Sequence, residues 1–446
     1  MAKKLFGTDG VRGVANVYPL TADFALNLAK ACADLLCQKY KKVAIAKDTR
    51  VSGDMLEAAL TAGFTAQGID VVKLGVLPTP AVTMVVSELQ TDMAVMITAS
   101  HNPYQDNGIK LINAAGDKFS DEVTSRLEEL VAKGAFAEGK SVGRVYEAKD
   151  GKDKYLALIG KVLSGTQPLK GLKVVLDCAN GCFSDIMPEV YRHFGAEVTA
   201  IADHPDGYNI NRDCGSQHVE ALCEAVKARQ ADIGIAADGD GDRIIVVNEK
   251  GEKVNAEQVI AYLAKYLQEK GRLNGRPVVS TVLSNTALET YIRSLGVAYY
   301  STKVGERHVI AKMQEVGGSV GGEESGHMVV ADYSKTGDAL VVSLMICKGL
   351  SESGKKMSEL FPLFDFDPFV FVNPRFASHE QIKRAMEDPE VIRLIEESKK
   401  AIEGQGRVVV RVSGTEPLIR IWVGGKDADL VQRLSGQLVA EISKFQ

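Results

Sequence analysis

A pattern of alternating strands and helices occurs three times along the chain, and no other feature of the sequence restricts the fold as much. The first copy has apolar strand sequences at 42–50, 68–75 and 92–103, separated by helical stretches. The same order recurs over residues 173–243 and again over residues 277–327. Parallel strands need crossover connections of this length, so the pattern predicts three similar domains in which helices cover parallel or mixed sheets.

The last part of the chain has a different pattern. Strand sequences at 369–376, 407–414 and 418–425 are combined with long helical stretches, which is typical of a smaller α+β domain. The segment 362–368, with the sequence PLFDFDP, reads as the linker before this domain. We therefore expect four domains around one central cleft: α/β domains at 1–150, 151–250 and 251–364, and an α+β domain at 365–446.

Composition restricts the class of partner. The formal net charge is −5, so electrostatics give no reason to expect nucleic acid or an acidic membrane. No apolar run reaches membrane-spanning length, and the N-terminal residues do not resemble a signal peptide. Cys178 and Cys182 could suggest a metal pair, but no second pair completes a zinc set. We interpret the seven cysteines as mostly buried thiols of a cytoplasmic protein.

The third strand of each copy ends in a polar loop. These loops have the sequences TASHNP (98–103), DGDGDR (238–243) and GEESGH (322–327). Ligands of open parallel sheets bind beyond the carboxyl ends of the strands. We therefore expect the three loops to face one cleft, together with RVSGTEP (411–417) from the last domain.

The DGDGDR loop places Asp238, Asp240 and Asp242 at alternate positions, with glycines that allow the backbone to curl. Three carboxylates so close repel each other unless a cation neutralises them, and hard oxygen ligands of this number suit Mg²⁺. A calcium loop is the main alternative, because Glu249 would be its twelfth residue. Arg243 occupies the position where such a loop has glycine, and a strand sequence, IIVV, follows. We therefore predict one Mg²⁺ here, rather than calcium or a solvated acidic turn.

Ser100 allows two interpretations. Serine, asparagine and proline are common in turns, so the sequence SHNP could simply end a strand. No acyl-transfer triad is evident, because His101 is only the sequence neighbour of Ser100. Beside three carboxylates, however, a phosphorylated Ser100 would supply a further oxygen ligand to Mg²⁺. We therefore include Ser100 among the metal ligands, and both Ser100 and His101 among the catalytic candidates.

The charge of such a site requires nearby cations. Three aspartates and one Mg²⁺ sum to −1, and a phosphoserine brings the site to about −3. Arg12, Lys110 and Arg243 are the candidates that could balance this charge. Phosphoryl transfer depends mainly on such positioning and charge compensation.

The remaining loops have residues suited to a phosphorylated ligand. His327 could transfer a proton, although a lone histidine is often structural. The 411–420 segment suits an anion nest, with a charged hairpin as the alternative. The weakest motif is KVGERH (303–308), where a helix N-terminus could meet a ligand. The substrate-binding candidates are Lys303, Gly305, Glu306, Arg307, Glu323, Ser325, Arg411, Ser413, Gly414, Thr415 and Arg420.

Taken together, the motifs point to a known family. FGTDGVRG, TASHNPYQDNGIK, DGDGDR, GEESGH, KTGDAL and SGTEPLIR occur in this order along essentially the whole chain. In this the sequence resembles the α-D-phosphohexomutases, most closely their bacterial glucosamine-phosphate branch. The resemblance implies three α/β domains of a shared type and a C-terminal phosphate-binding domain.

The resemblance also implies roles and a reaction. Ser100 would be the active phosphoserine, the three aspartates would hold Mg²⁺, and Arg12, Lys110 and Arg243 would surround the transferred group. The implied reaction interconverts glucosamine 6-phosphate and glucosamine 1-phosphate through a 1,6-bisphosphate, which would also serve as the activator. Its product would feed UDP-N-acetylglucosamine synthesis, and the resemblance makes a homodimer a reasonable expectation.

The sequence departs from that branch at Glu324, where its members often have glutamine or asparagine, and at VGERHV, where they have VGDRYV. A carboxylate at Glu324 could face an ammonium group of the substrate. A phosphomannomutase or phosphoglucomutase with the same mechanism is the alternative function. A Mg²⁺-dependent phosphohydrolase and a non-catalytic sugar-phosphate or calcium-binding module are more distant alternatives, because neither needs Ser100, Lys110 and the aspartate loop together.

Overall fold

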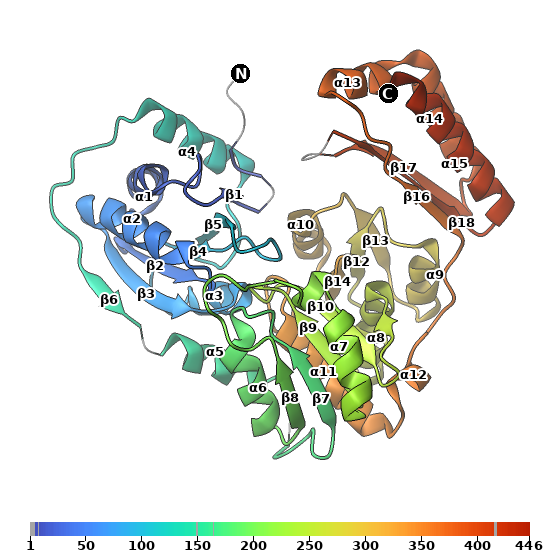
Figure 1. The fold of residues 1–446 in the computed structure, drawn as a ribbon, viewed down its shortest axis with the longest axis horizontal. Helices are drawn as coiled ribbons and strands as arrows, with labels where there is room; N and C mark the ends of the chain where they lie inside the picture. Colours follow the sequence, from blue (N-terminus) through green and yellow to red (C-terminus); the bar gives the residue numbers. More distant parts are fainter. Residues whose placement is uncertain (1–4, 8, 149, 164, 414–416) are drawn as a thin grey trace.

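The computed structural model describes residues 5–7, 9–148, 150–163, 165–413 and 417–446. Four units follow one another along the chain and lie around an arc, from the N-terminal unit to the C-terminal unit (Figure 1). The sheets of the first three units have six, five and four strands, and the C-terminal unit has a three-stranded sheet. This architecture agrees with the fold class predicted from the sequence.

The first sheet has the strand order β1-β5-β4-β2-β3-β6. Its strands are β1 (Val11–Val14), β2 (Lys42–Lys47), β3 (Asp70–Val76), β4 (Met93–Ile97), β5 (Asp106–Asn113) and β6 (Val145–Glu147). Successive side chains of a strand point to opposite faces. Ile45 therefore packs with α1 (Ala22–Leu36), α2 (Ser52–Ala66) and α4 (Asp121–Lys133), whereas Ala44 packs with α3 (Thr79–Val85) and α5 (Gly151–Ile159).

The second and third units repeat part of this arrangement, with the strand orders β11-β10-β9-β7-β8 and β13-β12-β14-β15. The second unit consists of β7 (Lys173–Asp177), α6 (Phe183–His193), β8 (Glu197–Ile201), α7 (Glu220–Arg229), β9 (Ile233–Ala237), β10 (Ile244–Asn248) and β11 (Lys253–Val254). The third consists of α8 (Ala256–Glu269), β12 (Val278–Thr281), α9 (Thr286–Ser294), β13 (Tyr299–Thr302), α10 (Glu306–Val316), β14 (Val320–Gly322), β15 (Met328–Val330), α11 (Ala339–Ser353) and α12 (Met357–Leu360).

One connection recurs in all three units. Strands β4, β9 and β14 each run parallel to the first strand of their copy and then turn into an antiparallel neighbour, β5, β10 or β15. The three polar loops of the sequence are these strand-to-strand connections. Because the copies share one topology, the loops leave equivalent edges of the three sheets.

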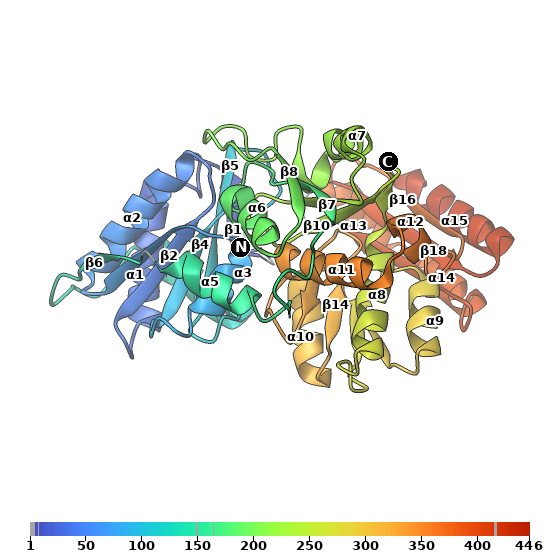
Figure 2. The ribbon, with the colours of Figure 1, turned by 90° about the horizontal axis from the view of Figure 1, so that it is seen from below.

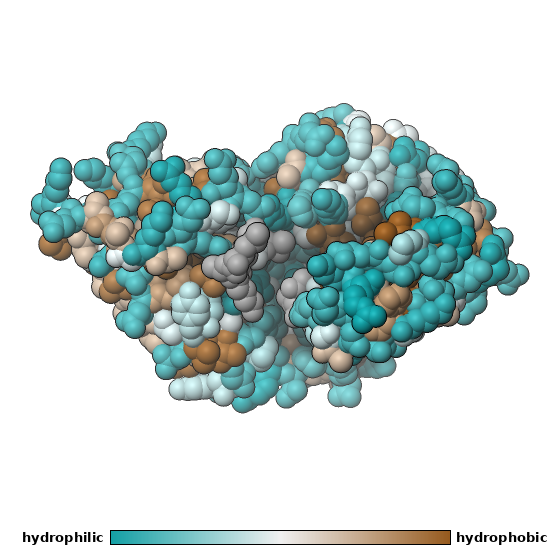
Figure 3. Space-filling view, turned by 90° about the horizontal axis from the view of Figure 1, so that it is seen from above, coloured by the Kyte–Doolittle hydropathy of each residue, from teal (hydrophilic) through white to brown (hydrophobic). Residues whose placement is uncertain are grey.

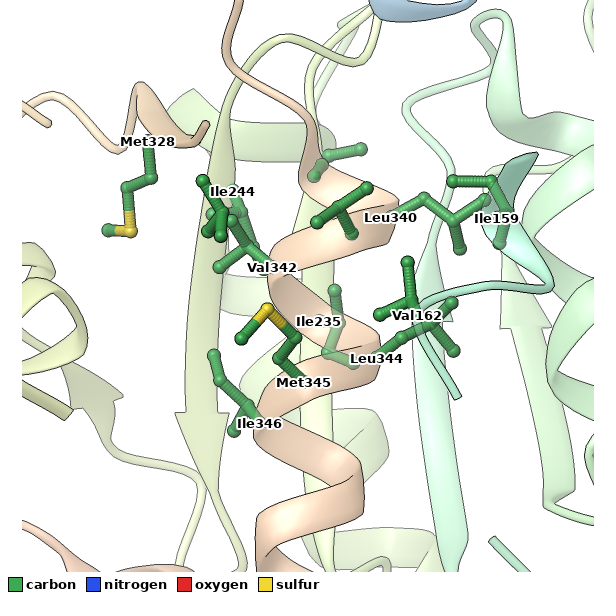
Figure 4. Close-up of a cluster of buried hydrophobic side chains, with 14 of the residues drawn as sticks. Ile159, Val162, Ile235, Ile244, Met328, Leu340, Val342, Leu344, Met345 and Ile346 are labelled. Atoms are coloured by element: carbon green, nitrogen blue, oxygen red, sulfur yellow. The ribbon is translucent and has the colours of Figure 1, made fainter. Parts of the chain in front are cut away.

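Helix α11 joins the second and third units. It follows β15 of the third sheet, but Leu340 and Leu344 pack in one cluster with Ile235 of β9 and Ile244 of β10 (Figure 4). The same cluster contains Ile159 of α5. One hydrophobic core therefore extends from the first unit to the third, with α11 near the middle of the molecule (Figure 2).

The C-terminal unit has a core of its own. Its antiparallel sheet has the order β16-β18-β17 and is packed by α13 (His379–Glu387), α14 (Pro389–Ala401) and α15 (Ala428–Ile442). The strands are β16 (Phe369–Val372), β17 (Gly406–Val412) and β18 (Ile419–Gly425). This cluster contains buried residues of positions 376–442 only.

The mostly buried thiols agree with the expectation from the sequence, and the surface is polar. The face in Figure 3 is mainly hydrophilic. Within the described ranges, no helix combines the length and the apolar character that a membrane crossing requires. All seven cysteines are free, and six of them, including Cys178 and Cys182, are buried.

Candidate active site

Ser100 lies three residues after β4, at the point where the first and second units meet. Its backbone has φ 54°, a left-handed conformation that is uncommon for residues other than glycine. The residue is 1% exposed. Its Oγ donates a hydrogen bond to Asp238 Oδ2 at 2.6 Å and lies 3.4 Å from Asp242 Oδ1. The structure therefore brings the serine loop and the aspartate loop together.

The three aspartates form one buried cluster. Ligand atoms of Asp238, Asp240 and Asp242 all lie within 4.8 Å of one another. Burial and the charges of the neighbouring aspartates raise the pKa of Asp238 and Asp240. Asp240 Oδ1 is buried and has no hydrogen-bond partner among the described residues. Repelling, incompletely satisfied carboxylate oxygens are the donor set that a hard divalent cation needs, so the residues fit Mg²⁺.

The calcium-loop alternative is inconsistent with the structure. Positions 244–248, which would have to belong to the ligand loop, form β10. Glu249, its would-be last ligand, accepts hydrogen bonds from the backbone N–H and the hydroxyl of Ser358 instead.

Lys110 lies on β5 beneath the cluster. Its Nζ is 2.8 Å from Asp240 Oδ2 and 3.0 Å from Asp242 Oδ2. Burial opposes the charged form of Lys110, but the two carboxylates raise its pKa well above the ordinary value. Burial also opposes ionisation of Asp242, but Lys110 and His327 lower its pKa. A buried ammonium group thus compensates part of the negative charge.

The other cationic candidates surround the serine loop. Arg12 donates from NH1 to the carbonyl oxygen of Ala99 at 3.2 Å, and Arg243 Nε lies 3.9 Å from Asp242 Oδ1. His101 Nδ1 is 3.4 Å from Ser100 Oγ. Burial, Arg243 and Arg12 lower the pKa of His101 to about 3, so its imidazole is neutral at pH 7.

His327 belongs to a chain of ion pairs between the third and first units. Its Nε2 is 2.9 Å from Glu306 Oε1, and Glu306 Oε2 in turn accepts from Lys118 Nζ at 2.5 Å. Lys118 also pairs with Asp9 at 2.6 Å. Burial opposes the imidazolium, but Glu306 raises the pKa of His327. Its Nδ1 is buried without a hydrogen-bond partner in the described part of the chain.

Four substrate-binding candidates of the third unit take part in protein contacts. The N–H of Gly305 donates to Glu323 Oε1 at 2.8 Å, which fixes that carboxylate beside the start of α10. Arg307 makes a bidentate contact with Asp121 of α4, at 2.7 and 2.8 Å. Glu306 is engaged with Lys118 and His327, as described above. Arg307 and Glu306 thus link the third unit to the first in this conformation.

The outer part of the same loops is more open. Lys303 and Glu324 are exposed, and Ser325 is partly exposed. Glu324 Oε2 accepts a hydrogen bond from Thr281 Oγ1 at 3.3 Å. Although the residue as a whole is exposed, partial desolvation of its carboxyl group and the charge of Glu323 raise the pKa of Glu324, whereas the Arg411 guanidinium acts in the opposite direction. Glu324 therefore lies between the sugar-binding candidates and the C-terminal unit.

The C-terminal unit contributes two adjacent arginines. Arg411 on β17 is paired in register with Arg420 on β18. Burial and the charge of Arg420 lower the pKa of Arg411, and Arg411 Nε is buried without a hydrogen-bond partner within the described segments. Two such guanidinium groups suit an anion. Ser413 is buried nearby, and Gly414 and Thr415 lie outside the described residues.

Several partners of these groups were not predicted from the sequence. Thr79, at the start of α3, donates to Asp240 Oδ2 at 2.6 Å. Asp9 pairs with Arg12, Lys110 and Lys118. Asp9 and Arg12 lie in the same motif, FGTDGVRG, so the aspartate could have been predicted beside the arginine. Arg50 was missed as well, although it follows β2 at the same edge of the sheet.

Each unit of the chain matches a described domain family. Residues 3–138, 153–251 and 255–365 match the phosphoglucomutase/phosphomannomutase alpha/beta/alpha domains I, II and III. Residues 372–441 match the C-terminal domain of the same proteins.

Whole-chain comparisons agree with these matches. The phosphoglucosamine mutase of Parvibaculum lavamentivorans is 43% identical over 447 residues, which cover 99% of each chain. A phosphoglucomutase/phosphomannomutase family protein from Burkholderia thailandensis has the same fold, with a TM-score of 0.82, 22% identity and coverage of 100% of this chain and 98% of that one. Aspergillus fumigatus N-acetylphosphoglucosamine mutase, solved with GlcNAc-6P and magnesium, gives a TM-score of 0.62 at 17% identity, over 90% and 82% of the chains. The chain therefore belongs to the phosphoglucomutase/phosphomannomutase family and is a phosphohexomutase, an isomerase-type phosphotransferase.

Proposed function

We propose that this enzyme interconverts glucosamine 6-phosphate and glucosamine 1-phosphate by way of a phosphoserine at Ser100. The observation that carries the proposal is the 2.6 Å hydrogen bond from Ser100 Oγ to Asp238, inside a buried cluster of three carboxylates and Lys110. A turn serine has no need of this environment. The relatives named phosphoglucosamine mutase support the choice of substrate.

The transfer step exchanges one P–O bond for another. The bond from phosphorus to Ser100 Oγ breaks, and a bond from phosphorus to the free hydroxyl oxygen of the sugar phosphate forms. The hydroxyl proton is lost from the sugar, and Ser100 Oγ ends with a proton, so atoms and charge balance. The resulting 1,6-bisphosphate turns over within the cleft and returns its other phosphoryl group to Ser100 by the reverse exchange.

The residues of the site have separable tasks in this step. Lys110, Arg12 and Arg243 would compensate the charge of the phosphoryl group, and His101 and His327 would exchange protons. Asp238, Asp240, Asp242 and an oxygen of phospho-Ser100 would hold one Mg²⁺. When bound, this ion would neutralise charge that develops on the phosphoryl oxygens.

The C-terminal arginines would hold the phosphate that is not transferred. One anion site there could serve both half-reactions, because the intermediate carries a phosphate at each end. Glu323 and Ser325 would bind sugar hydroxyls, and Lys303, Gly305, Glu306 and Arg307 remain substrate-binding candidates through the start of α10. Ser413, Gly414 and Thr415 would complete the anion site beside Arg411 and Arg420.

The finer organisation is part of the same proposal. The domains would be 1–150 with the phosphoserine loop, 151–250 with the metal loop, 251–364 with the sugar loop and 365–446 with the phosphate loop. A trace of sugar 1,6-bisphosphate would act as the activator, and the product would enter UDP-N-acetylglucosamine synthesis. A cytoplasmic homodimer is the expected form.

Replacement of the serine tests the mechanism. Ser100→Ala should lower the mutase rate by ~10³-fold or more, because it removes the phosphoryl carrier. Ser87→Ala, at an exposed serine between α3 and β4, is the control and should leave the rate unchanged. Intact-mass measurement should find one phosphate on the wild-type chain after incubation with the bisphosphate, and none on Ser100→Ala. A Ser100→Ala variant that keeps its activity, or releases inorganic phosphate as a hydrolase would, contradicts the proposal.

The sugar is tested separately by an assay over glucosamine, glucose and mannose phosphates, each with a trace of the matching 1,6-bisphosphate. The highest kcat/KM is expected for glucosamine 6-phosphate, since the carboxylate of Glu324 is able to face an ammonium group. A higher kcat/KM for mannose or glucose phosphates would contradict the proposed substrate but not the phosphoserine mechanism.

A further inference from the structure

The loop that carries Ser100 is held by a single buried guanidinium group. Arg50 follows β2 and is 2% exposed. A guanidinium group has five N–H donors in a fixed plane. In Arg50, each of these five donors has an acceptor. The acceptors are Asp48 Oδ2 and the carbonyl oxygens of Ser100, Asn102, Pro103 and Asp106.

These bonds define the path of the loop. The NH2 group of Arg50 donates to the carbonyl oxygens of Ser100, at 3.0 Å, and Asn102, at 2.7 Å. Its NH1 group donates to the carbonyl oxygens of Asp106, at 2.9 Å, and Pro103. Four carbonyl groups between positions 100 and 106 therefore converge on one side chain. A lysine has three donors on a flexible stem and cannot reproduce this fork.

Asp48 connects the same guanidinium to the backbone N–H of Ser100. Asp48 Oδ2 accepts from Arg50 Nε at 2.8 Å and from Thr98 Oγ1 at 2.7 Å. Thr98 Oγ1 in turn accepts from the N–H of Ser100 at 2.9 Å. The N–H and C=O of Ser100 are thus both fixed by buried groups that depend on Asp48 and Arg50.

The second unit holds the loop from the opposite side. Asn211 Nδ2 donates to the carbonyl oxygens of Ser100 at 2.9 Å and Asn102 at 3.0 Å, the same two atoms that Arg50 NH2 contacts. Asn211 is 7% exposed and comes from the segment between β8 and β9. Its side chain therefore ties the serine loop to the unit that carries the aspartates.

A left-handed backbone at a serine costs on the order of 1–2 kcal/mol and persists only where the surroundings impose it. With φ 54°, Ser100 points its Oγ at Asp238. We infer that Arg50 and Asn211 are positioning residues for phosphoryl transfer: they hold the Ser100 backbone in this conformation, so that Oγ faces the aspartate cluster. Among the described contacts, neither side chain donates a hydrogen bond to Ser100 Oγ or to the three aspartates of the cluster, so both act through the loop.

This inference rests on the proposed role of Ser100, and its test separates the two. Arg50→Lys keeps the charge and removes the fork. We expect kcat to fall by ~10–100-fold, because the nucleophilic oxygen of Ser100 would be displaced. The rate at which a sugar 1,6-bisphosphate phosphorylates Ser100 should fall by the same factor. The KM for the sugar phosphate should stay within about 2-fold, because Arg50 lies outside the substrate-binding loops.

Arg276→Lys is the matched control. Arg276 also donates to two backbone carbonyl groups, of Gly317 at 3.2 Å and Gly318 at 3.1 Å, and pairs with Asp332, but it supports a turn of the third unit. The same substitution there should change neither kcat nor the phosphorylation rate by more than about 2-fold. Equal losses in the two variants would reduce Arg50 to a general structural role and overturn the inference.

Asn211→Ala provides a second route if Arg50→Lys does not fold. It removes the donor from the second unit, leaves all five bonds of Arg50 and should slow Ser100 phosphorylation ~5–20-fold. In a Ser100→Ala background, both variants should bind the bisphosphate with unchanged Kd. Normal phosphorylation rates in both variants, or a loss confined to KM, overturn the inference while the phosphoserine mechanism stands. If Ser100→Ala is active, or if the wild type is not phosphorylated by the bisphosphate, both the proposed function and this inference are contradicted.

Discussion

The junction between the first two units differs sharply from the junction between the third and the C-terminal unit. At the first junction, Ser100 contacts Asp238, and Lys110 and Thr79 both contact Asp240, all in buried surroundings. The hydrophobic core also continues across it.

At the second junction the contacts are fewer and lie nearer the surface. Arg407 donates to the carbonyl oxygen of Val282 at 3.1 Å and to Glu289 at 3.2 Å. Asn285 Nδ2 donates to the carbonyl oxygen of Asp367 at 2.9 Å. The C-terminal unit keeps a separate hydrophobic core.

The difference corresponds to a division of labour. Phosphoryl transfer needs reacting oxygens fixed to within a fraction of an ångström, which a shared, continuous core provides. The proposed anion site has to admit a sugar phosphate in two orientations, and a separately packed unit on a linker suits this role. Substitutions at the first junction should therefore lower kcat, and substitutions at the second junction should raise KM.

The largest expected effect is at the first junction. Asp238→Asn should lower kcat by ~10³-fold, because it removes the negative charge and one of the two carboxylate oxygens from the group that accepts from Ser100 Oγ and would bind the metal. Added Mg²⁺ should raise the melting temperature of the wild type and much less that of the variant. Without metal, the variant should be at least as stable as the wild type, since burial and like charges raise the pKa of Asp238. Asp232→Asn, before β9 at the opposite end of the strand, is the control, and a kcat loss of similar size there would contradict the comparison.

A smaller effect is expected at the second junction. Arg407→Ala removes the contacts with Val282 and Glu289 and should let the C-terminal unit sample orientations that do not present Arg411 to the substrate. Apparent affinity falls in proportion to the competent fraction, so KM should rise ~3–10-fold with kcat within about 2-fold. Arg393→Ala, on the exposed side of α14, should change neither constant. A loss of kcat at constant KM would show that the C-terminal unit also positions the reacting groups.

The remaining effect concerns stability and not the kinetic constants: it is a pH dependence beside the linker. Glu257 Oε2 accepts from the N–H of Asn285 at 2.9 Å, and burial raises the pKa of Glu257 from 4.5 to about 7. The folded protein binds the carboxyl proton of Glu257 more tightly than the unfolded chain does. The free energy of unfolding therefore falls as the pH rises from about 4.5 to 7. Glutamine cannot ionise and keeps an oxygen acceptor.

Glu257→Gln should therefore match the wild type at pH 4.5 and exceed it at pH 8, by on the order of 1–3 kcal/mol in the free energy of unfolding. Thermal melts at the two pH values measure the difference. An offset that is the same at both values would mean that Glu257 is not the titrating group.

Much of the site could be predicted because its chemistry is local in sequence. Asp238, Asp240 and Asp242 occupy alternate positions of one loop, and an apolar strand precedes them, so their convergence needs no distant contact. The position of Ser100 could be predicted only because β4 and β9 occupy equivalent places in two copies of one pattern. The antiparallel strands β5 and β15 were not predicted as separate strands. Six consecutive residues of the eight in β5 are buried, so its sequence does not alternate between apolar and polar side chains, and β15 has only three residues.

Contacts between distant segments could not be predicted in the same way. Lys118 and Glu306 are 188 positions apart, and each alone resembles an ordinary surface charge. Arg50 and Asn211 meet at the carbonyl oxygen of Ser100 from two different units, and no spacing along the chain relates them to it.

The sequence by itself determined the order of strands and helices, the loops that carry polar groups and the chemistry of each loop, because these depend on residue type and on periods of a few residues. Only the tertiary structure decided which groups are paired and how Ser100 is held. Burial removes the water that would otherwise satisfy these groups, and the pairing then depends on which segments the packed units bring together. That is why Asp240 pairs with Lys110 through one oxygen while its other oxygen has no partner among the described residues. It is also why one arginine binds four carbonyl groups of the serine loop.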